Sequence, residues 1–301
     1  MLSLLEFHEQ QCARSRELYL QGRNPAQDAQ DWRQALYEAR RLIVETLRAS
    51  QYLTDVPAAL SRSGRHTLVL RHFLAPPISQ DQFQLICPSF SKGAEKGGAP
   101  IVGTRAEAIS ETFHERRSRR LSSWIDQGRR PSRRQLNGAI EVVAPLIAQQ
   151  RVATAQRHRL SVAQEEAVVD LLRNRQWTEV PSRPVRQAAE LPLHHFMHKT
   201  RFVSGPNENQ EVDIACGLRD TVVLAIECKV TNDVTNSVKR INDVLKKAAA
   251  WRTHWGSFII SAAVLQGVIK FADVKRLLDS GVEVFWAHNL DLFSDWLDSH
   301  S

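Results

Sequence analysis

The second half of the chain alternates between segments typical of strands and segments typical of helices. The strand-like segments are residues 212–216, 222–230, 257–265 and 282–287, and the helical ones are 235–251, 271–281 and 289–299. The third strand-like segment is almost entirely apolar, which indicates a strand covered on both faces. Two strands joined by a turn, then helix–strand–helix–strand, predict an α/β (mixed α+β) fold: a mixed central sheet flanked by helices.

Helical periodicity fills the first half of the chain. One face of the helix expected over residues 31–50 carries Trp32, Leu36, Ala39, Ile43 and Leu47. A long helical stretch is expected over 135–160, with an interruption near Pro145. Ser161 stands three residues before Gln164, and this capping-box pattern predicts that a new helix begins there. We therefore place a soft domain boundary near residue 160.

Three charged residues interrupt the apolar strand pair at 212–230. Glu227 and Lys229 are two positions apart, so on a strand their side chains leave the same face. Asp213 lies on the preceding strand, and the register decides whether it reaches them. Charged side chains are rarely buried unless they are paired or hold a metal. The three residues therefore either satisfy one another in a structural salt bridge or perform chemistry.

The overall charge favours a polyanionic partner. The net charge is +7, and eight arginines lie between Arg116 and Arg134. Arginine forms bidentate hydrogen bonds to phosphate that lysine does not, so this stretch is a candidate phosphate contact. A solvated helix face is the alternative. The residues that we expect to contact DNA here are Arg116, Arg117, Arg119 and Arg120.

The remaining composition excludes several classes of protein. No apolar run approaches the roughly 20 residues that span a bilayer, and the first residues are too polar for a signal peptide. We therefore expect a cytoplasmic protein without a membrane partner. The four cysteines form no CxxC pair, which argues against a zinc ribbon and gives no disulfide framework.

Two carboxylates on adjacent strands predict a magnesium site. Asp213 and Glu227 repel each other, and a divalent cation relieves that repulsion. Mg²⁺ suits the site because it prefers oxygen ligands and usually needs only one or two protein carboxylates. The backbone carbonyl of Cys228 is a plausible further ligand, and Lys229 can orient or polarise a water molecule. This set of groups suits metal-dependent hydrolysis of phosphodiester bonds.

The same residues carry a resemblance to a known family. Asp213 followed by "ECK" at 227–229 resembles the PD-(D/E)XK signature of restriction-endonuclease-like nucleases, although valine stands at 212, where proline often precedes the aspartate. "ECKVTNDVTNSVKRINDVLKKAAAW", "LAPPISQDQ" and "GVEVFWAHNLDLF" resemble segments of the XamI-type type II restriction endonucleases, with the likeness spanning roughly residues 68–300.

The resemblance implies a fold, an activity and site residues. It implies an enzyme that cuts double-stranded DNA within a short specific sequence, with Mg²⁺, and that Asp213, Glu227 and Lys229 are catalytic. Residues 161–301 would form the restriction-endonuclease-like catalytic core, and residues 1–160 a mainly helical region for DNA binding or dimerisation. A two-fold symmetric target would favour a homodimer.

Several further residues are candidates without a settled role. Asn and Gln can read adenine, and Arg and Lys guanine, in the major groove. The candidates directly after the second strand are Asn232, Asn236, Lys239 and Arg240, although capping of the next helix is an alternative role for Asn236 and Ser237. Glu211 and Glu190 are further acidic candidates for the metal site. A metal cluster or histidine base at His194, His195 and His198 is a weaker alternative.

Three functions fit these observations. The first is a site-specific endonuclease. The second is a repair or resolvase-type nuclease on the same fold, which would cut by DNA structure and not by sequence. The third is a basic DNA-binding protein without catalysis, which the presence of all three core residues disfavours.

Overall fold

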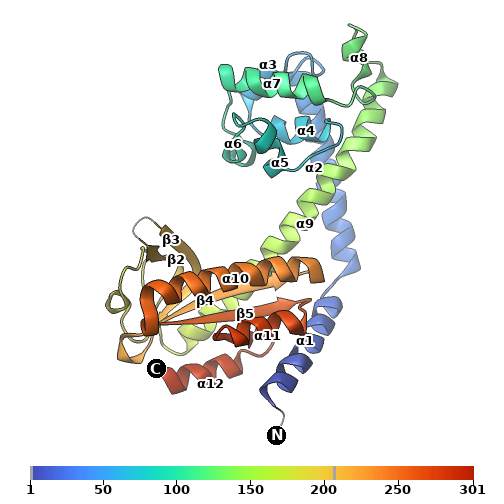
Figure 1. The fold of residues 1–301 in the computed structure, drawn as a ribbon. Helices are drawn as coiled ribbons and strands as arrows, with labels where there is room; N and C mark the ends of the chain where they lie inside the picture. Colours follow the sequence, from blue (N-terminus) through green and yellow to red (C-terminus); the bar gives the residue numbers. More distant parts are fainter. Residues whose placement is uncertain (1–2, 206–207) are drawn as a thin grey trace. The chain divides into compact units, whose positions relative to one another are not determined.

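The computed structural model describes residues 3–205 and 208–301, and the chain forms two compact units (Figure 1). Unit 1 comprises residues 1–24 and 156–301, and unit 2 comprises residues 25–155. The long helix α9 (Arg133–Asn174) contributes its first part to unit 2 and its last part to unit 1. The division places residues 1–24 with the sheet, whereas the sequence suggested a single soft boundary near residue 160.

A six-stranded mixed sheet forms the centre of unit 1, with its strands in the order of the sequence. The strands are β1 (Thr178–Glu179), β2 (His195–Gly205), β3 (Glu208–Gly217), β4 (Val223–Thr231), β5 (Ile259–Gly267) and β6 (Val282–Trp286). The β2–β3 and β3–β4 pairs are antiparallel, whereas β1–β2, β4–β5 and β5–β6 are parallel. The expected mixed sheet flanked by helices is confirmed.

Helices cover both faces of this sheet (Figure 1). They are α1 (Leu4–Gln21), α10 (Val234–Trp255), α11 (Phe271–Asp279), α12 (Asp291–His300) and the last part of α9. Three short 3-10 helices, η1 (Ala188–Glu190), η2 (Arg219–Thr221) and η3 (Gly256–Phe258), lie in connections between the elements of this unit. Apolar residues of α1, α10 and α11 pack with Leu265 and Val284 on one face. On the other face, apolar residues of α9 and α12 pack with Ile226 and Val264. The sheet is therefore a two-sided core, as the apolar run of β5 predicted.

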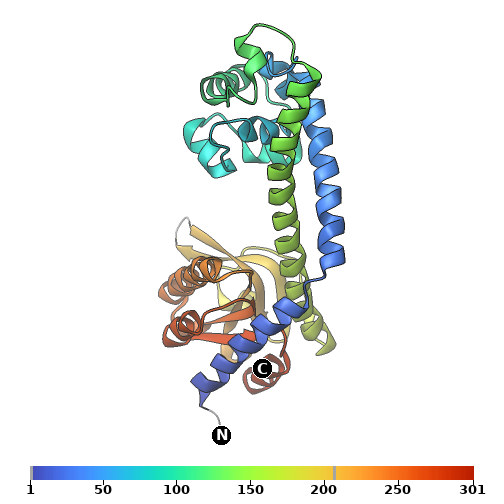
Figure 2. The same cartoon turned by 90° about the vertical axis from the view of Figure 1, so that its right-hand side faces the viewer.

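Unit 2 is entirely helical in its regular elements. Its helices are α2 (Pro25–Ala49), α3 (Val56–Arg62), α4 (His66–His72), α5 (Gln80–Ile86), α6 (Lys92–Gly97), α7 (Thr104–Arg116), α8 (Ser123–Asp126) and the first part of α9. Their core includes Ile43, Phe73, Phe113, Trp124 and Ile147. Helices α2 and α9 lie side by side in this unit, joined by Arg40–Glu141 and Arg151–Glu38 ion pairs (Figure 2).

Three local expectations are wrong. Ser161 does not begin a helix but lies inside α9, where its hydroxyl group donates a hydrogen bond to Glu165. Pro145 is accommodated within the same helix and does not interrupt it. Helix α10 begins with Asp233 as its cap, while Ser237 is buried and donates to Asp273.

Strand β2 was not predicted from the sequence; it pairs with β3 and so covers what would otherwise be an edge of the sheet. Its sequence, "HFMHKTRFVSG", mixes charged, polar and apolar residues without a clean alternation. None of the helices in the described residues is long and apolar enough to cross a membrane.

Candidate active site

The register of the sheet brings Asp213 and Glu227 to neighbouring positions on β3 and β4. The ladder between these strands runs from Gly217 opposite Val223 to Ile214 opposite Ile226. Asp213 and Glu227 are the next positions along, immediately beyond the last pair, where the two strands separate. Lys229 follows two residues later on β4, which pairs in parallel with β5. Both carboxylates therefore lie at the fork between two strands.

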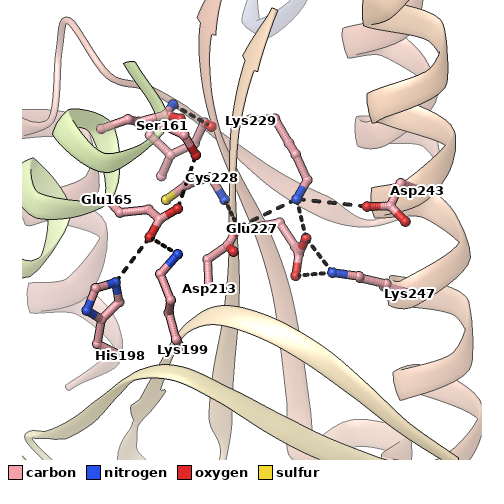
Figure 3. A network of polar contacts seen from close by, with 12 residues as sticks. Ser161, Glu165, His198, Lys199, Asp213, Glu227, Cys228, Lys229, Asp243 and Lys247 are labelled. Carbon is pink, nitrogen blue, oxygen red and sulfur yellow. Dashed lines mark hydrogen bonds and ion pairs between the residues drawn. The ribbon is translucent and has the colours of Figure 1, made fainter. Parts of the chain in front are cut away.

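The ammonium group of Lys229 lies close to both carboxylates (Figure 3). Its Nζ is 2.5 Å from Glu227 Oε2 and 3.5 Å from Asp213 Oδ2. Asp213 Oδ2 also accepts a hydrogen bond of 2.8 Å from the backbone N–H of Cys228. The side chain of Glu227 is fully buried, whereas that of Asp213 is 24% exposed. Oxygen atoms from two strands thus converge on one cationic group.

Helix α10 adds a second carboxylate–ammonium pair that the sequence analysis missed. Lys247 Nζ donates to both oxygens of Glu227, at 3.0 Å from Oε1 and 2.9 Å from Oε2. Asp243 Oδ2 lies 3.9 Å from Lys229 Nζ. Asp243 and Lys247 are four residues apart, so they share one face of the helix. The four-residue spacing can be read from the sequence, but the strand that this helix face covers cannot.

Burial and the neighbouring charges together determine the protonation of this cluster. Burial raises the pKa of Glu227, although the nearby Lys229 and Lys247 partly offset the effect. Burial works against the charge of Lys229, but Glu227 and Asp213 outweigh it and raise the pKa of that ammonium group. Lys229 is therefore held as a cation, which suits it for orienting a nucleophile or stabilising negative charge and not for acting as a base.

A second buried carboxylate, Glu165 on α9, lies beside this cluster (Figure 3). Its Oε2 accepts from Lys199 Nζ at 2.7 Å and lies 3.2 Å from His198 Nε2. Hydrogen bonds from these two residues and from Ser161 outweigh burial and lower the pKa of Glu165. Lys199 has a left-handed backbone conformation (φ 51°) within β2, and strained positions of this kind gather at functional sites.

The comparison with protein families decides what kind of enzyme carries this cluster. Residues 51–286 match the model of the family described as XamI restriction endonuclease. The chain belongs to that family. It is also 32% identical, over 192 residues, to the type II restriction enzyme XamI of Xanthomonas campestris pv. amaranthicola, covering 62% of this chain and 67% of that protein.

One solved structure is a weaker match. The crystal structure of protein VC1899 from Vibrio cholerae aligns with 92% of this chain at 11% identity and a TM-score of 0.33. The chain spans 57% of the length of that protein. A score this low supports no argument about a shared fold.

The oxygen atoms of this candidate active site suit a small divalent cation as a ligand set. Within the described residues, no three His, Cys, Asp or Glu side chains are grouped closely enough to hold a metal by themselves. Mg²⁺ does not need such a group, because it binds through one or two carboxylates and keeps several waters. Asp213, Glu227 and the Cys228 carbonyl would provide that set. Each of the two carboxylates places an oxygen atom within 3.5 Å of Lys229 Nζ, and this convergence of negative charge favours a cation beside the ammonium group.

The other acidic and histidine candidates have partners elsewhere. Glu211 pairs with Arg201 at 2.8 Å, and Glu190 accepts from the backbone N–H of Arg186 at 2.9 Å. The ring of His194 packs against Trp177, and His195 hydrogen-bonds the carbonyl of Leu193. Of the three histidines, only His198 joins the network around Glu165 in the described structure. The three therefore do not form a cluster.

The candidates for base reading lie exposed at the start of α10. Asn232, Asn236, Lys239 and Arg240 are all solvent-exposed. The backbone N–H of Asn236 donates to the Asp233 side chain, and its amide group donates to Asn232 and Asp233. Asp233, which the sequence analysis overlooked, thus caps the helix and orders this short polar surface close to the end of β4.

The arginines of unit 2 do not form a single set. Arg116, Arg119 and Arg120 are exposed. The guanidinium group of Arg117 is buried and donates to Ser122 and Asp126. Because its charge is already paired inside the unit, Arg117 drops out of the expected phosphate contacts.

Proposed function

We propose that the protein is a type II restriction endonuclease that hydrolyses phosphodiester bonds within a short specific sequence of double-stranded DNA, with Mg²⁺ as its cofactor. The observation that carries the proposal is the convergence of Asp213 and Glu227 on the Lys229 ammonium group at the fork of β3 and β4. Membership of the XamI restriction endonuclease family supports the reaction class.

In this mechanism Asp213, Glu227 and the carbonyl of Cys228 would hold the cation. The bound ion would acidify water and stabilise negative charge on the phosphate. Lys229 positions the attacking water and stabilises the charge that develops on the phosphate oxygens. Its contacts with carboxylates on two strands fix the position of its ammonium group before the substrate binds. Such preorganisation is the main source of electrostatic catalysis.

DNA recognition is assigned to exposed residues of both units. We propose that Asn232, Asn236, Lys239 and Arg240 include contacts to base edges, because the surface that they form directly follows the catalytic strand. Arg116, Arg119 and Arg120 would contact phosphates and give unit 2 a role in DNA binding. Cleavage of a two-fold symmetric site would be performed by a homodimer.

Digestion of a mixed-sequence plasmid tests this proposal. We expect discrete bands with Mg²⁺ or Mn²⁺, binding but little cleavage with Ca²⁺, and no cleavage with EDTA. Sequencing of the fragment ends would then give the recognition site. Full activity in EDTA would contradict the metal site, and the absence of discrete bands would contradict cleavage at a specific sequence.

A further inference from the structure

Glu227 is held by two ammonium groups, and the two are attached differently. Lys229 contacts three carboxylates: Glu227 at 2.5 Å, Asp213 at 3.5 Å and Asp243 at 3.9 Å. Among the described residues, Lys247 contacts Glu227 alone, through both of its oxygens (Figure 3). Lys229 is therefore held by three carboxylates, and Lys247 by one.

The two carboxylate oxygens of Glu227 also accept different numbers of hydrogen bonds. Oε2 accepts from both lysines, whereas Oε1 accepts from Lys247. The carboxylate is fully buried, so in the described structure these two ammonium groups provide its compensation. A cation bound by Glu227 has to coordinate one of these oxygens, and each of them is already within 3.0 Å of Lys247 Nζ.

A divalent ion at this position repels both ammonium groups. Like charges a few ångströms apart in a partly buried site repel each other strongly, because the protein screens them less than water does. Lys247 is the ammonium group that can move away from Glu227, because its side chain is 15% exposed and, among the described residues, it contacts no other carboxylate. Lys229 is 8% exposed and keeps Asp213 and Asp243 as partners.

We propose that Lys247 is a latch on the metal-ligand carboxylate, which neutralises and orients Glu227 in the metal-free enzyme and releases at least one of its oxygens when the cation binds. Lys247 is thus a positioning residue that competes with the metal and not a catalytic residue. The inference rests on the proposed metal site at Asp213 and Glu227, and it adds a built-in competitor for that site.

Manganese binding without DNA tests the latch directly. The signal of free Mn²⁺ in electron paramagnetic resonance gives the dissociation constant for metal-free protein. We expect Lys247→Met to bind Mn²⁺ roughly tenfold more tightly than wild type, because one competing positive charge is gone. Lys247→Arg keeps the charge and should bind close to wild type. The matched control is Lys246→Met, which removes the exposed neighbouring charge and should change the affinity by no more than about twofold.

Thermal unfolding provides a second readout. Without metal, Lys247→Met should melt below wild type, because a buried carboxylate has lost one of its two partners. At saturating Mn²⁺ the difference in melting temperature between Lys247→Met and wild type should become smaller, because Lys247 has then released Glu227 in the wild type as well. If Lys247→Met fails to fold, Lys247→Gln replaces it, since a neutral amide still donates one hydrogen bond to Glu227 while removing the charge.

The failure of the latch is distinguishable from the failure of the metal site. Mn²⁺ affinity that is unchanged or weaker in both Lys247→Met and Lys247→Gln would overturn the latch, provided that Glu227→Gln weakens binding. Wild-type Mn²⁺ affinity in both Glu227→Gln and Asp213→Asn would overturn the metal site and the latch together.

Discussion

Each unit of the molecule buries a carboxylate beside a cation, and the two arrangements differ in balance and closure. In unit 2, Arg71 and Glu95 are 1% and 4% exposed and lie 3.1 Å apart. Arg71 also donates to the Ile78 carbonyl and to Gln150, while Glu95 accepts from Gln80. One positive and one negative charge are enclosed in a satisfied network.

The cluster in unit 1 is neither balanced nor closed. Three carboxylates, of Asp213, Glu227 and Asp243, face two ammonium groups, of Lys229 and Lys247. Asp213 and Asp243 are 24% and 50% exposed, so the cluster reaches solvent at its edge. Burial of charge by itself therefore does not indicate catalysis. The excess of carboxylates in unit 1, with access to solvent, is what the proposed metal site requires, because it leaves negative charge for a cation to neutralise.

The largest expected effect is on the rate of DNA cleavage, which should depend on the cluster in unit 1. Lys229→Met should lower the rate of cleavage by about 10³-fold or more, since it removes a group placed to stabilise the transition state. The protein should remain folded and bind its target, because Glu227 keeps Lys247 as a partner. Initial rates on plasmid DNA, gel-shift binding and thermal unfolding check this. Cleavage at the wild-type rate, or a variant that melts far below wild type, would contradict a catalytic role.

The next effect concerns stability in unit 2. Arg71→Met should lower the free energy of unfolding by about 3–5 kcal/mol, because it leaves Glu95 buried without its cation. This loss should exceed that of Lys229→Met, whose carboxylate partner retains a second ammonium group. Chemical denaturation measures both.

Arg40→Met is the matched control in unit 2, since it removes an exposed pair with Glu141 and should cost at most about 1 kcal/mol. Equal losses for Arg71→Met and Arg40→Met would show that the buried network does not stabilise the unit.

Acid should weaken unit 2 through a buried histidine. Burial lowers the pKa of His72 from 6.5 to about 4. The folded state thus favours the neutral ring, whose stabilising effect is present above pH 6.5 and is lost as the pH falls towards 4. The loss should reach up to about 3 kcal/mol at pH 4. His72→Leu should flatten the fall of unfolding free energy between pH 6.5 and pH 4, and an unchanged pH profile would exclude His72 as its cause.

The smallest effect distinguishes exposed from internally paired arginines. Combined replacement of Arg116, Arg119 and Arg120 by alanine should weaken binding to all DNA sequences. It should also flatten the salt dependence by up to about 0.9 log unit of slope per lost contact. Arg117→Ala should instead lower stability, since Arg117 pairs with Asp126, and leave the slope unchanged. Binding measured across salt concentrations decides, and an unchanged slope in the triple variant would identify these arginines as a solvated face.

Local pattern was enough for the central part of the fold and for one edge of the site. The alternation of strand and helix signals after Val212 predicted the mixed sheet, because burial on both faces requires apolar runs of strand length. Two-residue periodicity placed Glu227 and Lys229 on one face, since side chains alternate along any strand. Arg117 escaped the same reasoning, because a sequence does not tell an arginine that faces solvent from one that reaches an internal aspartate.

The sequence by itself determined the order of strands and helices after Val212, the shared face of Glu227 and Lys229, and the family resemblance that the motif carries. Only the tertiary structure decided that Asp213 stands at the fork beside Glu227, that Lys247 and Asp243 of α10 and Glu165 of α9 join the site, and that α1 packs with the sheet. The physical reason is the range of the interactions. Periodicity and caps act within a few residues, whereas strand register and helix packing depend on how distant apolar surfaces are buried together.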